Sequence, residues 1–150
     1  METSAEIQNR LRDLFESQRL AVVATQTGGQ PYASLVAFVA TDDLRHLFFV
    51  TAKTTRKFAN LISNSRVAVL VNSSVNQESD FHDAISLTVT GIAEEMKGSE
   101  RQDTLDLYLS KHPYLEDFAR SPSCALIRVA ARSYYMVQNF QSVMEFHIDQ

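Results

Sequence analysis

The stretch Leu47-Phe48-Phe49-Val50-Thr51-Ala52-Lys53-Thr54-Thr55-Arg56-Lys57 changes its chemistry halfway along. Its first four residues are apolar and typical of a buried strand, and an apolar helical pattern begins directly after it at Phe58. This order predicts a strand, a short turn and the N-terminus of a helix of about residues 55–63. The free N–H groups and the positive dipole end of a helix N-terminus form a binding place for anions.

The charges in this stretch are unusual for their position. The first turn of a helix favours Asp or Glu, and an exposed cation there costs roughly 0.3–1 kcal/mol. Arg56 and Lys57 nevertheless occupy that turn. Two interpretations are open: a solvated basic corner with ordinary threonine caps, or a site where hydroxyl groups and cations hold a phosphate.

Six or seven strands are expected around this stretch. Short apolar runs alternate with Gly, Asp and Asn turns, which is typical of an antiparallel meander rather than of βαβ units. The turn Thr27-Gly28-Gly29-Gln30 separates the first two runs. The predicted strands are residues 20–25, 32–40, 46–50, 66–71, a longer strand that begins at 85, and two closing strands at 124–130 and 134–139.

Helices are expected at the start, in the middle and late in the chain. Apolar residues from Ile7 to Phe15 recur at helical spacing. The polar residues 72–83 predict a long loop. The capping candidates are Thr3 with Glu6, Asn64 as a left-handed C-cap, and Ser99 with Gln102. The predicted fold is mainly β, a small and mostly antiparallel barrel with an N-terminal helix, a helix after the third strand and a late helical insertion.

Composition restricts the class of protein. At 150 residues the chain is expected to form one domain, residues 1–150. Its net charge of −4 argues against a general binder of nucleic acid or anionic membranes. Cys124 is the single cysteine, lies in an apolar run and is expected to be a small buried thiol. With no apolar stretch near the ~20 residues of a membrane span and no signal-peptide pattern, a cytoplasmic protein is expected.

Several catalytic motifs are absent from the sequence. It has no nucleophile-elbow motif, no His-Glu-x-x-His or Cys-x-x-Cys pattern, and neither a P-loop nor a Gly-x-Gly-x-x-Gly fingerprint. Asp80, His82 and Asp83 have metal-ligand chemistry, but in a polar loop solvated charge is the more common role. No catalytic side chain and no metal site is therefore predicted.

An ordered set of segments resembles a known family. Gly29-Gln30-Pro31-Tyr32-Ala33-Ser34, then the strand ending at Thr51, then Thr55-Arg56-Lys57 with Asn60-Leu61, and finally Asn64-Ser65-Arg66-Val67 are similar to the pyridoxamine 5′-phosphate oxidase-like FMN-binding split barrels. The similarity extends from about Leu20 to Phe140 and includes the haem-utilisation branch of that family. It implies a split barrel that binds FMN.

Matching positions imply the site residues. Thr51, Thr55, Arg56 and Lys57 would bind the FMN phosphate, and Ser34, Leu35, Val36 and Ala37 would lie beside the isoalloxazine ring. Ser86 stands where the oxidases have a glutamine that touches the flavin. Residues 135–140 resemble the last barrel strand, which approaches the flavin from the partner subunit, so a homodimer is implied. Plain barrel core is the alternative for residues 34–37 and 135–140.

The sequence also departs from the family. The true oxidases end in a segment rich in Arg and Trp that grips pyridoxal phosphate, and this chain has no tryptophan. Oxidation of pyridoxamine phosphate is therefore not expected. The resemblance implies an FMN-dependent oxidoreductase that acts on a small organic substrate. The alternatives are a flavin- or haem-binding module without turnover, a deazaflavin (F420) reductase, and a barrel whose basic corner is only surface.

Overall fold

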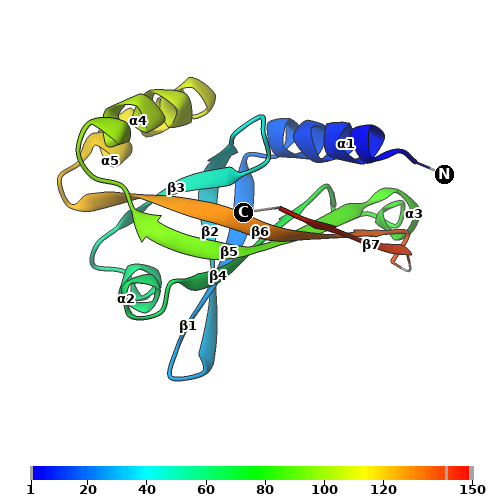
Figure 1. The fold of residues 1–150 in the computed structure, drawn as a ribbon, viewed down its shortest axis with the longest axis horizontal. Helices are drawn as coiled ribbons and strands as arrows, with labels where there is room; N and C mark the ends of the chain where they lie inside the picture. The colour runs from blue at the N-terminus through cyan, green and yellow to red at the C-terminus, as the bar shows by residue number, and fades with distance from the viewer. Residues whose placement is uncertain (1, 141, 149–150) are drawn as a thin grey trace.

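The structure, a computed structural model, describes residues 2–140 and 142–148. Within these residues, seven antiparallel strands form a sheet in the order β3-β2-β1-β4-β5-β6-β7, and pairing of β3 with β6 closes the first six into a barrel (Figure 1). The strands are β1 (Leu20–Thr27), β2 (Gln30–Ala40), β3 (His46–Ala52), β4 (Arg66–Asn72), β5 (Ile85–Glu95), β6 (Cys124–Gln138) and β7 (Ser142–His147). The helices are α1 (Ser4–Ser17), α2 (Arg56–Ser63), α3 (Asp80–Asp83), α4 (Ser99–Lys111) and α5 (Glu116–Arg120), with a 3₁₀ turn at Pro113–Leu115.

The predicted fold class is confirmed. The sheet is antiparallel, α1 precedes the barrel, α2 follows β3, and α4 with α5 forms the late insertion. The β1–β2 turn places Gly28 and Gly29 at φ 59° and 80°, a region that glycine enters without steric cost. The antiparallel part of the prediction therefore holds, but the order is not a simple meander, because β4 pairs with β1 instead of β3, and β3 pairs with β6.

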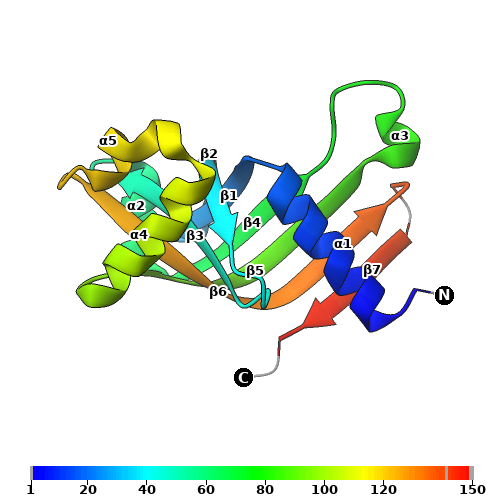
Figure 2. The ribbon, with the colours of Figure 1, turned by 90° about the horizontal axis from the view of Figure 1, so that it is seen from above.

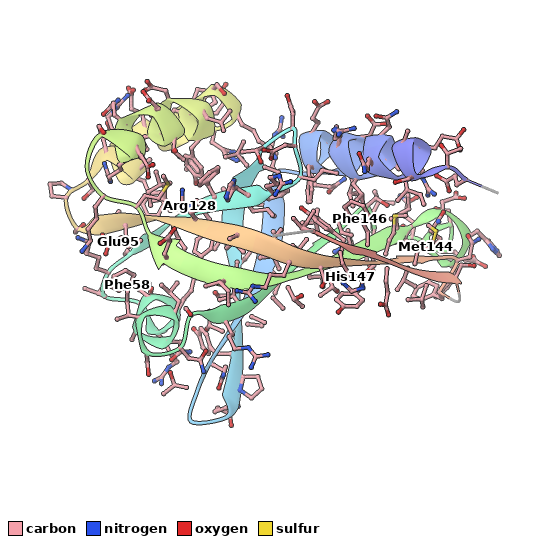
Figure 3. The ribbon with its side chains drawn as sticks, viewed as in Figure 1. Phe58, Glu95, Arg128, Met144, Phe146 and His147 are labelled. Atoms are coloured by element: carbon pink, nitrogen blue, oxygen red, sulfur yellow. The ribbon has the colours of Figure 1, made fainter. Side chains whose placement is uncertain are left out.

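The main difference from the predicted elements lies near the C-terminus. The strands predicted at 124–130 and 134–139 are one strand, β6, which continues through a β-bulge opposite Thr90 and Gly91. A seventh strand, β7, follows and is missing from the set of predicted strands. Its Met144 and Phe146 point toward α1, whereas His147 points to the opposite face (Figure 3).

Helix caps were predicted with mixed success. The capping box of Thr3 and Glu6 is confirmed. The left-handed C-cap at Asn64 is wrong: this residue is extended (φ −143°, ψ 114°) because β4 begins two residues later. The cap at Ser99 is also wrong, because Gly98 at φ 73° takes the N-cap position of α4 and no side chain caps it. The predicted loop at 72–83 contains the short helix α3.

The helices cover the barrel from two sides. Helix α1 and the α4–α5 insertion lie over one side of the barrel, and α2 lies on the other (Figure 1 and Figure 2). The insertion packs on β3 and β6 in a second apolar cluster, which also buries Cys124 as expected. No helix in the described part of the chain is both long and apolar enough to cross a membrane.

Helix α2 is held against β1 by a buried polar network. The Asn60 Nδ2 atom donates to Thr25 Oγ1 (3.1 Å), and Thr27 Oγ1 donates to Asn60 Oδ1 (2.8 Å). Both Thr25 and Asn60 are buried, so water cannot replace the bond between them.

Replacing Asn60 with alanine is therefore expected to lower the free energy of unfolding by about 2–3 kcal/mol, since two hydrogen bonds are lost and a buried hydroxyl loses its donor. Urea unfolding measures this difference. The control is Asn64→Ala, which removes one exposed hydrogen bond to the N–H of Arg66 and should cost under about 1 kcal/mol. Equal effects of the two substitutions would contradict the network.

Candidate functional site

The barrel opens where β2 and β3 separate. These strands pair only between Phe38–Ala40 and Leu47–Phe49, whereas β2 pairs with β1 along most of its length. The edge of β2 before Phe38 therefore carries backbone groups that β3 does not bind. A cavity of about 220 Å³ lies at this opening. Its lining residues are Leu35, Val36, Ala37, Val50, Thr51, Ala52, Thr55, Lys57, Tyr108, Leu115 and Phe118.

Two threonine hydroxyls form one wall of this cavity. Thr55 caps α2: its Oγ1 accepts from the N–H of Phe58 (3.2 Å) and donates to the carbonyl of Ala52 (2.8 Å). Because the Thr55 proton is already committed, Thr51 donates across the 3.0 Å contact between the two hydroxyl oxygens. In the described residues, the N–H groups of Arg56 and Lys57 have no acceptor. These two N–H groups are therefore the free donors at the start of α2.

The three cations of residues 47–57 (Lys53, Arg56 and Lys57) have different surroundings. Lys57 is only 8% exposed, lines the cavity, and lies 6.0 Å from the ring centroid of Phe49. Its ammonium has no carboxylate partner among the described residues, and burial lowers its pKa. Arg56 is exposed outside the cavity lining, and Lys53 pairs with Glu95 at the end of β5 (3.6 Å). Lys57 is thus the cation that the fold directs into the cavity.

Three of the four residues predicted on β2 line the cavity. Leu35, Val36 and Ala37 form the wall opposite Thr51, and the Leu35 side chain is 62% exposed. Ser34 does not line it, but its Oγ is buried and has no hydrogen-bond partner in the described part of the chain. This wall combines an apolar surface with an open backbone edge, which suits a planar ring with polar margins.

Tyr108 is a cavity residue that the sequence did not reveal. It lies on the apolar face of α4 and therefore has the pattern of a core residue, yet its buried hydroxyl has no hydrogen-bond partner among the described residues. Burial raises the pKa of Tyr108 to about 12, so the phenol keeps its proton. An unpartnered buried polar atom beside a cavity is a candidate ligand contact.

Tyr108→Phe is expected to leave the stability of the ligand-free protein unchanged or to raise it by up to about 1 kcal/mol, because it removes an unpaired buried hydroxyl. The matched control is Tyr134→Phe, since the buried Tyr134 hydroxyl donates to the carbonyl of Leu44 and its loss should cost about 1–2 kcal/mol. Urea unfolding compares them. If both substitutions destabilise equally, the Tyr108 hydroxyl has a structural partner.

Ser86 lies in a different cavity. This second cavity, of about 250 Å³, is lined by Asn72, Ser74, Ala84, Ile85, Ser86, Val137 and Phe140. The structure therefore does not bring Ser86 together with the Thr51–Lys57 group within one chain. The 135–140 segment enters the same second cavity through Val137 and Phe140, and the Phe140 ring lies 5.6 Å from that of Phe81.

In the polar loop before β5, the side chain of Asp80 forms hydrogen bonds with the backbone of the same loop. The Asp80 carboxylate accepts from the N–H groups of Val75 and Gln77, which lowers its pKa. Across residues 2–140 and 142–148, no cluster of three His, Cys, Asp or Glu side chains could hold a metal ion. The loop carboxylate thus stabilises the loop itself.

Comparisons with solved structures show which proteins share this fold. A haem-binding protein from Mycobacterium smegmatis superimposes with a TM-score of 0.84 at 15% identity, over 98% of this chain and 59% of that one. An FAD-binding protein from Mesorhizobium loti gives 0.71 at 20% identity (89% and 92% covered), and the haem storage protein HutZ from Vibrio cholerae gives 0.72 at 14% identity (91% and 92% covered). This chain therefore spans about three fifths of the Mycobacterium protein.

Sequence comparison assigns the family. A search of curated proteins finds no match. The family profile of pyridoxamine 5′-phosphate oxidase matches residues 7–138, which include every strand of the closed barrel, α2 and the cavity between β2 and β3. The chain thus belongs to the pyridoxamine 5′-phosphate oxidase-like split-barrel family.

Proposed function

We propose that the protein binds FMN, with the flavin phosphate at the N-terminus of α2 and the ring along the open edge of β2. The observation that carries this proposal is Lys57, a buried ammonium that lines the cavity without a described carboxylate partner. An unpaired buried charge is costly, and an anion in the cavity removes that cost. The free N–H groups of Arg56 and Lys57 adjoin the same helix end and favour the same kind of ligand.

Each residue of the phosphate part would have its own task. Lys57 supplies a compact charge, and the two N–H groups supply directed donors. Thr55 holds the helix end in place through Phe58 and Ala52, and Thr51 supports Thr55. Arg56 is exposed, so its contribution would be a weaker attraction screened by water.

The ring part would rest on β2. Leu35, Val36 and Ala37 provide apolar contact, and the unpaired backbone groups of this edge can bond the polar margin of the isoalloxazine. When bound, FMN supplies the electron transfer, while the protein orients the ring and controls access to it. Leu115 and Phe118 from the helical insertion limit the entry of water on the opposite side.

A second copy of the chain would complete the site. Ser86, Val137 and Phe140 share a cavity separate from the phosphate residues, and in the proposed dimer they would contact the flavin held by the partner subunit. Leu20, Leu35 and Val143 are 52%, 62% and 62% exposed, a degree of apolar exposure that burial between two copies would relieve. These observations support a homodimer with flavin at its interface.

The reaction class that fits is flavin-dependent oxidation or reduction of a small organic substrate. Haem is the second candidate, because two structural neighbours bind or store haem. A haem iron usually needs an axial side chain such as histidine, and no histidine lines the cavities described around Lys57 and Ser86. Deazaflavin also carries a phosphate and would compete for the same residues.

The test compares FMN with riboflavin by quenching of flavin fluorescence in the full chain. FMN is expected to bind about 100-fold more tightly, since the phosphate contacts contribute about 3 kcal/mol. Haem titration read at the Soret band and competition by F420 separate the alternatives. A colourless protein that takes up no FMN, or equal affinity for riboflavin, would overturn the proposal. Reduction of the bound flavin by NADH or NADPH distinguishes an enzyme from a carrier.

The affinity for FMN is expected to fall at alkaline pH. Burial holds the pKa of Lys57 below its usual 10.5, so the ammonium loses its proton at a lower pH than an exposed lysine does. The loss of charge weakens phosphate binding as pH rises toward 10.5. Lys57→Arg keeps its charge throughout, so its affinity should not show this decline. Fluorescence titrations of both proteins from neutral pH upward test the idea, and parallel profiles would contradict it.

A further inference from the structure

The largest of the described cavities lies away from the α2 site. It has a volume of about 510 Å³ on the outer face of the sheet, near the β1–β2 hairpin. Its lining residues are Ala24, Thr25, Gln26, Pro31, Arg66, Val67, Ala68, Thr90, Gly91, Ile92 and Arg132. Two arginines face this cavity, and no carboxylate lines it.

The β-bulge in β6 places one of these arginines there. Thr90 pairs with Ser133 and Gly91 with Ala131, so Arg132 is the extra residue. Ala131 and Tyr134 are both buried, and the two residues between them therefore lie toward the outer face. Without the bulge, regular alternation would direct one of them into the barrel.

The geometry of the bulge depends on Gly91. A Cβ atom on Gly91 would lie 2.4 Å from the carbonyl oxygen of Ala130. The bulge also lies where β6 changes its neighbour on one edge, from β3, which reaches Ala130, to β7, which begins to pair at Ser133. The direction of Arg132 is therefore set by this bulge, whose position follows from how β3, β5 and β7 pair with β6.

Arg66 reaches the same cavity from β4. Arg66 pairs with Ile92 on the neighbouring strand β5. On its other side, Ala24 of β1 pairs with Ala68 in an antiparallel register, so Gln26 lies next to Arg66. Gln26, Arg66 and Ile92 therefore form one row on the outer face. Neither Arg66 nor Arg132 has a carboxylate partner in the described residues, whereas Arg128, four residues earlier in β6, pairs with Glu94.

We propose that this cavity binds an oxyanion, the phosphate or carboxylate group of a small molecule. Guanidinium groups bind both groups in a bidentate manner, and two exposed guanidinium groups without described carboxylate partners on one cavity both attract an anion that enters it. The Gln26 amide and the Thr90 hydroxyl add neutral donors on the same wall. The site shares no residue with the cavity at Lys57, so it does not depend on FMN binding.

The experiment is a titration of the ¹⁵N-labelled full chain with inorganic phosphate and, separately, with citrate. It is followed at the amides of Gly91, Ile92 and Arg132. Saturable shifts at these amides are expected, and the arm with the lower Kd shows whether phosphate or carboxylate is preferred. In the double variant Arg66→Ala with Arg132→Ala, affinity should fall by at least about tenfold. Arg19→Ala with Arg101→Ala, which removes equal charge elsewhere, should leave it within about twofold.

Shifts at Thr55 and Phe58 report anions at the α2 site, so failure of one site is distinguished from failure of the other. Core amides that keep their shifts show that the double variant is folded. Three results would overturn the proposal: no saturable shift at Gly91, Ile92 and Arg132; equal affinity in the double variant; or weaker self-association of the double variant without any phosphate or citrate response. The last result would mean that the arginines pair with carboxylates of a second copy.

Discussion

Replacing Lys57 with alanine is expected to weaken FMN binding by about 10- to 100-fold. A charge-assisted hydrogen bond contributes about 1.5–3 kcal/mol, and each 1.4 kcal/mol changes affinity about tenfold. Arg56→Ala should have a smaller effect, because Arg56 is exposed and outside the cavity lining, whereas Lys57 is buried within it. Fluorescence titration of FMN into each variant measures the difference.

The matched control for this prediction is Lys53→Ala. Lys53 lies in the same turn but pairs with Glu95, so its removal should change the Kd of FMN by less than about threefold. If the double variant Arg56→Ala with Lys57→Ala also stays within about threefold of the unmodified protein, the phosphate is not bound at α2.

Replacing Gly91 with alanine is expected to destabilise the barrel by about 3 kcal/mol or more. The added methyl group would lie 2.4 Å from the backbone oxygen of Ala130, and a backbone atom in a closed barrel cannot turn aside as a flexible side chain can. The β5–β6 pair, the longest in the sheet, would have to open at the bulge. Urea unfolding gives the change in the free energy of unfolding.

Gly98→Ala is the comparison for Gly91→Ala. Gly98 has φ 73° and ψ −152°, a region that is almost restricted to glycine, but no atom lies within 4 Å of the place that a Cβ atom would take, so alanine there should cost about 1–3 kcal/mol from backbone strain alone. A loss at Gly91 no larger than that at Gly98 would show that the bulge relaxes around the methyl group. It would also contradict the view that the bulge, which directs Arg132 to the outer face, depends on Gly91.

The strand, turn and helix formed by residues 47–63 could be predicted because neighbouring residues alone determine them. An apolar run ended by Thr51, a threonine cap at Thr55 and a helical pattern from Phe58 specify a strand, a turn and a helix over neighbouring residues. The β1–β2 hairpin was equally clear from Gly28 and Gly29. Where turn chemistry and periodicity agree, the sequence alone indicates the element.

The errors arise where distant residues decide the structure. The alternation of β6 is interrupted at Arg132, so one strand has the pattern of two, and only pairing with β5 shows that it continues. Asn64 is extended because β4 begins directly after α2, which overrides its preference for a left-handed cap. β7 is stabilised by Met144 and Phe146 packing on the barrel core, a contact that no local motif records.

The candidate site was predictable only in part for the same reason. Thr51, Thr55 and Lys57 line one cavity, because a strand end and a helix start fix their positions. Tyr108 joins them from α4 through tertiary packing, and its unpaired hydroxyl cannot be seen in a sequence. Ser86 lies in another cavity, and its proposed role would need a second chain.

The most direct test of the central claim is a crystal structure of the full chain grown with FMN. We expect a phosphate oxygen within hydrogen-bond distance, about 2.7–3.2 Å, of Lys57 Nζ and of the N–H groups at the start of α2, with the ring along Leu35–Ala37. A phosphate bound elsewhere, with Lys57 still unpaired beside an empty α2 terminus, would contradict it.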